Sequence, residues 1–380
     1  MTSERTPLKT PTQITIAGPH MGFDVDSIST GERFEGKWLR LMASPLVQCH
    51  WVVRSTLGFT RDLSPNHHFH KIKRSRGLRR IIQEVRALRP LIKRHNVSLL
   101  RFHSVHFGTP VAALLCAAGR RMPILVQHHH FEEPRKKYEA RVKRLAKLGA
   151  HFVCPSDSAC KELMVLGVPV KQTSLIPSVL FNWKTEYANI ALKNKDERDY
   201  DLIFVGDLIP RKRPEIIISV AAELQKRTSQ RRIEVAIVGR GELLEKLQAL
   251  AAAANVQVDF FTNCGEKMKW DLLKRSHIFF TPSAHEGFGY AALEAALAGL
   301  WVISSDCGAL PETLAGLQNA LCVAPDAFHP AYLAGVCRER LKSAPDPVPP
   351  SIVARFTDEE RWRSDHEKIL FQVAHGRVEK

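Results

Sequence analysis

The sequence predicts a two-domain α/β protein in which each domain has a parallel sheet covered by helices. The chain has 380 residues, about twice the length of a typical domain. Short apolar segments alternate with longer amphipathic ones through two successive stretches, which is the pattern of two parallel α/β units. A polar stretch without sustained periodicity, residues 182–200, separates them. We therefore expect an N-terminal domain over 1–181, a linker over 182–200 and a C-terminal domain over 201–356.

The N-terminal half contains one strongly periodic helix and a series of short apolar segments. Residues 78–94 carry apolar side chains at i, i+3, i+4 and i+7, which predicts an amphipathic helix with one face in the core. The remaining segments are short and apolar, as expected for the buried strands of a parallel sheet. They predict strands at 13–17, 97–102, 123–127, 151–155 and 174–177 and a helix at 111–120.

The C-terminal half repeats the alternation with clearer boundaries. Its segments predict strands at 201–205, 234–238, 257–261, 278–281 and 301–304 and helices at 214–226, 243–254, 289–297 and 330–341. A proline-rich stretch, 344–350, ends this domain, because proline cannot continue a helix or donate within a sheet. A final helix is predicted near 357–373.

The charge of the chain favours anionic partners. Fifty-five Lys and Arg residues against 39 Asp and Glu residues give a net charge of +16, with a pI near 9.6. The excess is concentrated in residues 71–101 and 135–147. It suits nucleotide phosphates or an anionic membrane surface better than nucleic acid, because no zinc-finger, RNP-like or helix-turn-helix motif is present. Two interpretations of the basic helix at 78–94 stay open, a solvated face over a core helix and docking to an anionic bilayer.

Cysteine usage and hydropathy indicate a reducing compartment and no membrane span. The eight cysteines contain no CxxC pair, which fits reduced thiols better than a disulfide or zinc scaffold. No apolar run approaches the roughly 20 residues that span a bilayer, and the first residues lack an apolar signal segment. We expect a cytoplasmic protein, with peripheral binding at the inner face of the membrane as an open alternative.

Residues 281–312 contain the pattern that carries most information on function. A predicted strand leads into a loop with Glu286 and Gly287-Phe288-Gly289, and a predicted helix with Glu294 follows. Two glycines let a ligand approach the backbone, and the helix N-terminus offers N–H groups and a favourable dipole to an anion such as a diphosphate. A carboxylate one to two turns into the helix can accept hydrogen bonds from ribose hydroxyls. The pattern therefore predicts a nucleotide-sugar site at the carboxyl end of a strand.

The same segment resembles the family 4 retaining glycosyltransferases of the GT-B fold. Their signature is a Glu, seven residues and a second Glu, which Glu286 and Glu294 match in spacing. Three further segments are similar to elements of this family: FVGDLIPRK at 204–212, IVGRG at 237–241 and DCGALPE at 306–312. The resemblance covers residues 200–315 strongly and the N-terminal half mainly in its strand order.

The resemblance implies a fold and an activity. The fold would be α/β of the GT-B class, two Rossmann-like domains facing across a cleft, with a C-terminal helix, 357–380, that packs back on the N-terminal domain. The reaction would move a hexosyl or N-acetylhexosaminyl group, with retention, from a UDP- or GDP-sugar to an acceptor hydroxyl, such as that of a lipid-linked or cell-envelope glycan. The nucleotide sugar is a co-substrate, and no cofactor and no metal are expected.

The family pattern also assigns roles to individual residues. Glu286 is expected to position the sugar, and His129, with His128 as the second choice, to contact the sugar or the reacting oxygens. A metal site at residues 128–130 is disfavoured, because three consecutive side chains after a strand cannot all face one ion. The donor is expected to contact Gly206, Arg211, Lys212, Gly239, Gly287, Phe288, Gly289, Glu294 and, by a looser match, Gly22.

Departures from the family pattern keep two alternatives open. Asp207 stands where the family has an Arg, which removes one expected partner of the diphosphate. Arg211 or Arg213, on either side of Lys212, is a candidate to replace it. A non-catalytic protein that binds sugar nucleotides therefore stays open, and a GT-B epimerase or phosphorylase would share the fold.

Overall fold

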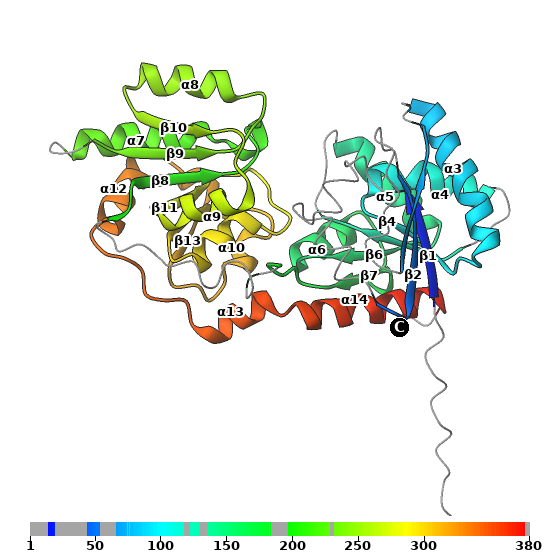
Figure 1. Ribbon diagram of the computed structural model, residues 1–380. Helices are drawn as coiled ribbons and strands as arrows, with labels where there is room; N and C mark the ends of the chain where they lie inside the picture. Colours follow the sequence, from blue (N-terminus) through cyan, green and yellow to red (C-terminus); the bar gives the residue numbers. More distant parts are fainter. Residues whose placement is uncertain are drawn as a thin grey trace, which may run out of the picture. The chain divides into compact units, whose positions relative to one another are not determined.

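The structure is a computed structural model that describes most of the chain (Figure 1). The described residues are 14–19, 44–53, 66–73, 75, 77–117, 122–129, 135–181, 183, 197–228 and 232–376, except for the side chains of 19, 106–109 and 117. The predicted donor residue Gly22 and most of the predicted linker lie outside the described residues.

The chain divides into two compact units. The first comprises residues 1–155, 160–177 and 359–380, and the second comprises 156–159 and 178–358. The last helix therefore belongs to the first unit, although it follows the second unit in sequence. The segment Ser156–Ala159 belongs to the second unit, although both of its neighbouring segments belong to the first.

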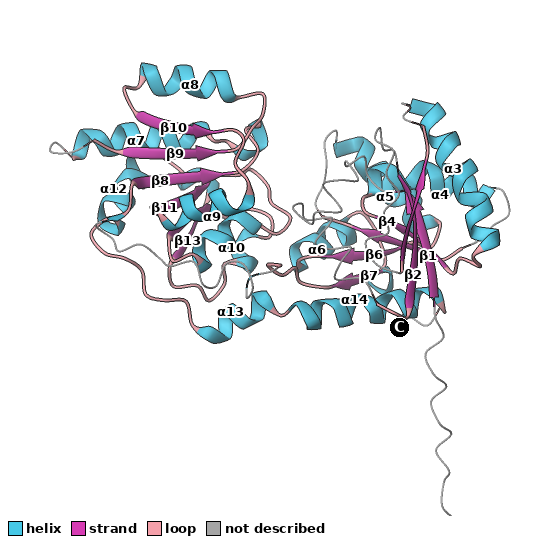
Figure 2. Ribbon diagram, in the orientation of Figure 1, coloured by secondary structure: helices cyan, strands magenta, loops and turns pink. Residues whose placement is uncertain are grey.

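The first unit is built on a seven-stranded parallel sheet with the order β3-β2-β1-β4-β5-β6-β7. Its strands are drawn in magenta in Figure 2. Every residue of β4 and β6 is buried, as expected of parallel strands with both faces covered. The strands are β1 (Ile14–Pro19), β2 (Val47–Val53), β3 (His67–Lys71), β4 (Leu99–Phe102), β5 (Ile124–Gln127), β6 (His151–Cys154) and β7 (Thr173–Leu175). The helices are α3 (Gly77–Arg94), α4 (Val105–Ala117), α5 (Arg135–Lys147), α6 (Asp157–Val165), η1 (Val170–Gln172) and α14 (Glu359–Ala374). Helix α14 packs against β4 and β5, and the first three residues of α6 belong to the second unit.

The second unit has a six-stranded parallel sheet with the order β10-β9-β8-β11-β12-β13. This is the strand order of the Rossmann fold, whose direction reverses between β8 and β11. The strands are β8 (Tyr200–Val205), β9 (Glu234–Val238), β10 (Gln257–Phe261), β11 (Ser276–Thr281), β12 (Trp301–Ser305) and β13 (Ala320–Val323). The helices are η4 (Pro210–Lys212), α7 (Glu215–Arg227), α8 (Leu244–Ala253), α9 (Glu266–Lys274), α10 (Tyr290–Leu297), α11 (Leu310–Thr313), η5 (Pro325–Ala327), α12 (Pro330–Arg340) and α13 (Pro350–Thr357).

The topology of the second unit places two loops at one edge of the sheet. Strands β8 and β11 are neighbours, so the loops after their carboxyl ends lie side by side. The first loop contains η4 with Lys212, and the second runs from Pro282 to Gly289 and contains Glu286. Ligands of open parallel sheets bind at such a reversal of strand order. The two loops are therefore where a candidate site is sought.

Candidate functional site

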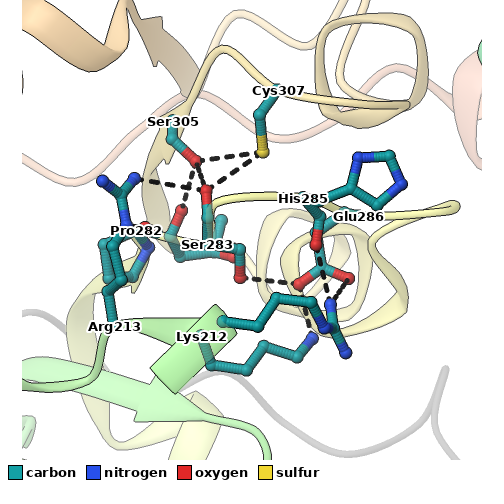
Figure 3. Close-up of polar contacts among 10 residues, drawn as sticks. Lys212, Arg213, Pro282, Ser283, His285, Glu286, Ser305 and Cys307 are labelled. Atoms are coloured by element: carbon teal, nitrogen blue, oxygen red, sulfur yellow. Dashed lines mark hydrogen bonds and ion pairs between the residues drawn. The ribbon is translucent and has the colours of Figure 1, made fainter. Parts of the chain in front are cut away.

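Glu286 lies at the centre of a cluster of polar side chains in the second unit (Figure 3). Its Oε1 atom forms an ion pair with Lys212 Nζ and accepts a hydrogen bond from Ser283 Oγ at 2.7 Å. Its Oε2 atom lies 3.8 Å from Arg211 Nη1, which also donates to the carbonyl oxygen of His285 at 2.7 Å. The Glu286 residue is 8% exposed, so its charge is largely removed from water and is balanced by these cations.

The side chain of Arg213 holds the same loop through hydrogen bonds to its backbone. Its Nε atom donates to the carbonyl oxygen of Pro282, and its Nη2 atom donates to that of Ser283 at 3.3 Å. Ser305 Oγ and Cys307 Sγ also donate to the Ser283 carbonyl oxygen, at 2.5 and 3.0 Å (Figure 3). Of the two arginines predicted to stand in for the missing family residue, Arg211 is therefore the one beside Glu286, and Arg213 holds the loop.

The carbonyl groups of residues 285–288 are all hydrogen-bonded from within the second unit. In chain order they accept from Arg211 Nη1 at 2.7 Å, Ala309 N at 2.9 Å, Ser156 Oγ at 3.0 Å and Thr313 Oγ1 at 2.5 Å. In a planar trans peptide the N–H of a residue points opposite to the preceding carbonyl. The N–H groups of residues 287–289 are thus aimed away from these partners, at the start of α10, where an anion can be bound.

Gly308 allows the close contact that shapes this loop. It has φ +53°, and a Cβ atom at this position would lie 2.2 Å from the carbonyl oxygen of Glu286. No side chain tolerates that approach, because real Cβ contacts with backbone atoms are longer than 3.0 Å. The turn with Gly308 can therefore lie directly against the backbone of Glu286 only because the residue is a glycine.

Two of the predicted donor-binding glycines, Gly206 and Gly239, contact each other. A Cβ atom on Gly239 would lie 1.9 Å from the carbonyl oxygen of Gly206, and Gly239 has φ +151°. Both follow neighbouring strands, β8 and β9. The ends of these two strands lie so close together that there is no room for a side chain at position 239. This packing explains the glycine without reference to ligand binding.

Glu294, the second glutamate of the predicted pair, lies on α10. Its side chain is 14% exposed, and its Oε1 atom accepts a hydrogen bond from Lys269 Nζ at 2.8 Å. Both glutamates of the motif are therefore paired with a lysine inside the second unit, Glu286 with Lys212 and Glu294 with Lys269.

The two candidate histidines belong to the first unit and have different surroundings. His128 is fully buried, with Nδ1 3.0 Å from Tyr138 Oη and Nε2 3.7 Å from Glu162 Oε2, which indicates a structural role. His129 is half-buried, and burial together with the nearby His128 and Arg101 lowers its pKa to about 4. The His129 imidazole is therefore neutral at pH 7 and able to donate or accept a hydrogen bond.

The described residues contain no metal-binding cluster and no membrane-spanning helix. In the described parts of the chain, no group of three or more His, Cys, Asp or Glu side chains is arranged to hold a metal ion. His130, the third histidine of the run, lies outside those parts. Of the helices described, none is both long and apolar enough to cross a bilayer.

Several residues that hold the site were not found from the sequence. Ser283 lies within the segment 281–312, and Thr313 directly follows it. Their hydroxyl groups, so close to the motif in sequence, were the signal that could have identified them. Ser156 and Lys269 lie far from the motif and carry no sequence signal. Glu312 accepts hydrogen bonds from the backbone N–H groups of residues 157 and 158 of the same unit, at 2.9 and 3.2 Å.

Two family models match the chain. The model of Glycosyltransferase Family 4 matches residues 40–179, and the model of Glycosyl transferases group 1 matches residues 188–338. Together the two matches span well over half of the sequence. Each half of the chain is therefore similar to a glycosyltransferase family model. The resemblance found from the Glu-x7-Glu segment is thereby confirmed, and the match at 40–179 extends it to the N-terminal half.

The curated relatives match this chain over part of their length. The D-inositol 3-phosphate glycosyltransferase of Gordonia bronchialis is 32% identical over 137 residues, which are 34% of this chain and 30% of the relative. The gpi3 subunit of phosphatidylinositol N-acetylglucosaminyltransferase of Schizosaccharomyces pombe is 27% identical over 171 residues, 43% of this chain and 36% of the relative. The chain thus spans about a third of the length of the curated relatives it matches.

Solved structures similar to this chain confirm the predicted fold class. Sucrose-phosphate synthase from Thermosynechococcus elongatus has a TM-score of 0.68 at 16% identity, over 96% of this chain and 100% of that one. Anabaena HepE in complex with UDP and glucose has a TM-score of 0.65 at 13% identity, over 94% of this chain and 99% of that one. The fold is α/β of the GT-B class, with two Rossmann-like domains.

Proposed function

We propose that this protein is a retaining glycosyltransferase that moves a hexosyl or N-acetylhexosaminyl group from a UDP- or GDP-sugar to an acceptor hydroxyl. The observation that carries the proposal is the arrangement around residues 285–288. Their carbonyl groups are hydrogen-bonded within the unit, so the N–H groups of residues 287–289 point away from these partners. Lys212 and Arg211 lie beside Glu286. Of the solved structures it resembles, HepE binds UDP and glucose, which supports a nucleotide-sugar donor.

The charge of this cluster suits a departing nucleoside diphosphate. Arg211 and Lys212 both lie beside the carboxylate of Glu286, so this cluster carries net positive charge. Donors that are already fixed in place stabilise the negative charge that develops on a leaving group without reorganising. We propose that Lys212, Arg211 and the N–H groups of residues 287–289 supply this stabilisation, and that no metal or cofactor is needed.

The remaining predicted residues receive roles around the donor. Glu286 is proposed to hold the hydroxyls of the sugar, with Ser283, Lys212 and Arg211 fixing its carboxylate. Glu294 is proposed to accept hydrogen bonds from the ribose hydroxyls. His129, whose imidazole is neutral, stays the candidate from the first unit for contact with the sugar or the reacting oxygens.

The acceptor is proposed to be a hydroxyl of a lipid-linked or cell-envelope glycan, used at an anionic membrane surface. One curated relative is named for D-inositol 3-phosphate and another for phosphatidylinositol. Helix α3 of the first unit supports a peripheral contact with the inner face of the membrane, because Leu78 is 69% exposed and Ile82 38% exposed on a basic helix. Its exposed cations are Arg79, Arg86, Arg89, Lys93 and Arg94.

Calorimetric titration with UDP and GDP, without added divalent metal, tests the proposal. We expect saturable binding of one nucleotide, weakened by roughly 1–3 kcal/mol in Glu294→Ala, because a hydrogen bond to a charged group is lost. Glu245→Ala removes an exposed carboxylate of α8 in the same unit and serves as the control, with unchanged affinity. Binding of neither nucleotide by the folded protein would contradict the proposal. Binding without transfer to any acceptor would favour the non-catalytic alternative.

A further inference from the structure

Lys269 links α9 to the helix that carries Glu294. Its Nζ atom donates to Glu294 Oε1 at 2.8 Å and to Glu266 Oε2 and Oε1 at 3.1 and 3.3 Å. The ammonium group also lies 5.5 Å from the centre of the Trp270 ring, within the range of a cation–π interaction. The side chain of Lys269 is 13% exposed and that of Glu294 14%, so their contact is mostly shielded from water. The ammonium group of Lys269 is therefore held in place by contacts within the second unit.

The two carboxylates keep Lys269 charged in spite of this burial. Burial favours the neutral amine and lowers the pKa of Lys269, but the nearby Glu294 and Glu266 outweigh it, and the pKa is raised overall. The three side chains together carry one net negative charge where the two carboxylates alone would carry two. A charged hydrogen bond is also directional, so the ammonium fixes how the Glu294 carboxylate is turned.

We propose that Lys269 is a positioning residue that orients Glu294 toward the ribose of the donor nucleotide. The inference rests on the proposed function, which gives the ribose hydroxyls to Glu294. Without the ammonium, Glu294 and Glu266 repel each other and Glu294 loses its fixed orientation. The contacts of the diphosphate with Lys212 and with the loop before α10 do not involve Lys269. The loss should therefore fall on recognition of the ribose and leave the diphosphate contacts in place.

The test compares UDP with 2′-deoxy-UDP, or GDP with 2′-deoxy-GDP if the protein binds GDP, by calorimetry. We expect the wild type to prefer the ribonucleotide about tenfold or more, the value of a hydrogen bond to a charged group. In Lys269→Gln the preference should fall to about twofold or less. Lys267→Gln removes an exposed lysine of the same helix and should keep the wild-type preference. A change in fold stability alone would lower the affinity for both nucleotides without changing their ratio.

The possible outcomes separate this inference from the proposed function. A wild-type ratio retained in Lys269→Gln would overturn the role of Lys269 and leave the donor site standing. Equal binding of the two nucleotides by the wild type would overturn it as well, because no ribose preference exists to be lost. Binding of neither nucleotide would overturn both proposals. If Lys269→Gln does not fold, Lys269→Met removes the same charge with an unbranched side chain of similar length and answers the same question.

Discussion

Gly308 is the residue on which the shape of the loop with Glu286 depends most directly. The Cβ atom of an alanine would lie 2.2 Å from the Glu286 carbonyl oxygen, and φ of +53° strains any L-residue. We expect Gly308→Ala to lower the free energy of unfolding by about 3 kcal/mol, because strain and displacement of the loop add. Equilibrium unfolding in urea measures this change.

Gly316→Ala is the matched control for this substitution. Gly316 also has positive φ, +82°, but a Cβ atom there would meet only Ile352 Cδ1, at 3.7 Å. The control should therefore lose about 1 kcal/mol, the cost of backbone strain alone. Equal losses in the two variants would show that the contact with Glu286 does not contribute.

At the scale of residues, the sequence singled out groups that the structure brings together within one unit. Lys212 and Glu286 lie in separate segments, yet both follow neighbouring strands of a Rossmann sheet, so their pairing follows from topology. Ser156 could not be found in this way, because its contact with the Gly287 carbonyl spans 131 positions. Lys269 contacts Glu294 from a neighbouring helix whose packing is not encoded in any local pattern.

A cluster of histidines on β2, on β3 and directly after α3 should make the first unit sensitive to acid. The His50 ring stacks on His68, His70 and His95 at centroid distances of 4.8, 5.2 and 4.0 Å. Burial and these three neighbours lower the pKa of His50 from 6.5 to about 3. The unfolded chain therefore binds a proton below pH 6.5 that the folded chain does not take up until about pH 3. The free energy of unfolding therefore has its full contribution from His50 above pH 6.5, and it decreases as the pH falls from 6.5 to about 3.

His50→Gln should reduce this dependence on pH. At pH 5 the wild type is expected to lose about 2 kcal/mol relative to pH 7.5 through His50, since one pKa unit is worth about 1.4 kcal/mol. Differential scanning calorimetry at the two pH values should show a smaller shift of Tm for the variant. His375→Gln, at an exposed position, should behave as the wild type. An unchanged pH dependence in His50→Gln would contradict the prediction.

At the scale of elements, strong apolar periodicity was sufficient to predict a helix, but segments without it could still form helices or strands. The helix predicted over 78–94 is observed at Gly77–Arg94, because its apolar stripe is wide. Helix α5 was missed since its buried stripe consists only of Tyr138, Val142 and Leu145 among many basic residues. Strand β3 was missed since three of its five residues are histidines, which are not strand formers.

At the scale of the whole molecule, alternation of strands and helices was enough to predict two parallel α/β units. Both sheets are parallel, and the second has the Rossmann order. The return of the chain to the first unit with Glu359–Lys380 was predicted from the family resemblance and not from composition, and the place of Ser156–Ala159 in the second unit was not predicted. Both depend on long-range packing, which local patterns do not record.

The chain has a net charge of +16, and the excess of cations is concentrated in residues 71–101 and 135–147. This charge predicts binding to anionic vesicles. Helix α3 presents exposed cations together with Leu78 and Ile82, and each basic residue near an anionic surface contributes roughly 1 kcal/mol. We expect co-sedimentation with vesicles of anionic lipid at low salt, little with neutral lipid, and release as salt shortens the screening length from about 10 Å at 0.1 M to about 3 Å at 1 M.

A pair of triple variants shows whether α3 or the overall charge is responsible. Replacing Arg79, Arg86 and Arg89 by Gln should abolish most of the sedimentation, because the cations are lost where Leu78 and Ile82 are exposed. The control replaces three exposed cations of the second unit by Gln and should bind nearly as well as the wild type, since it has the same net charge as the α3 variant. Equal loss in both variants would mean that total charge, and not α3, drives the contact. Equally poor sedimentation with anionic and neutral vesicles at low salt would remove the membrane proposal. The control positions are Arg232, Lys246 and Lys267.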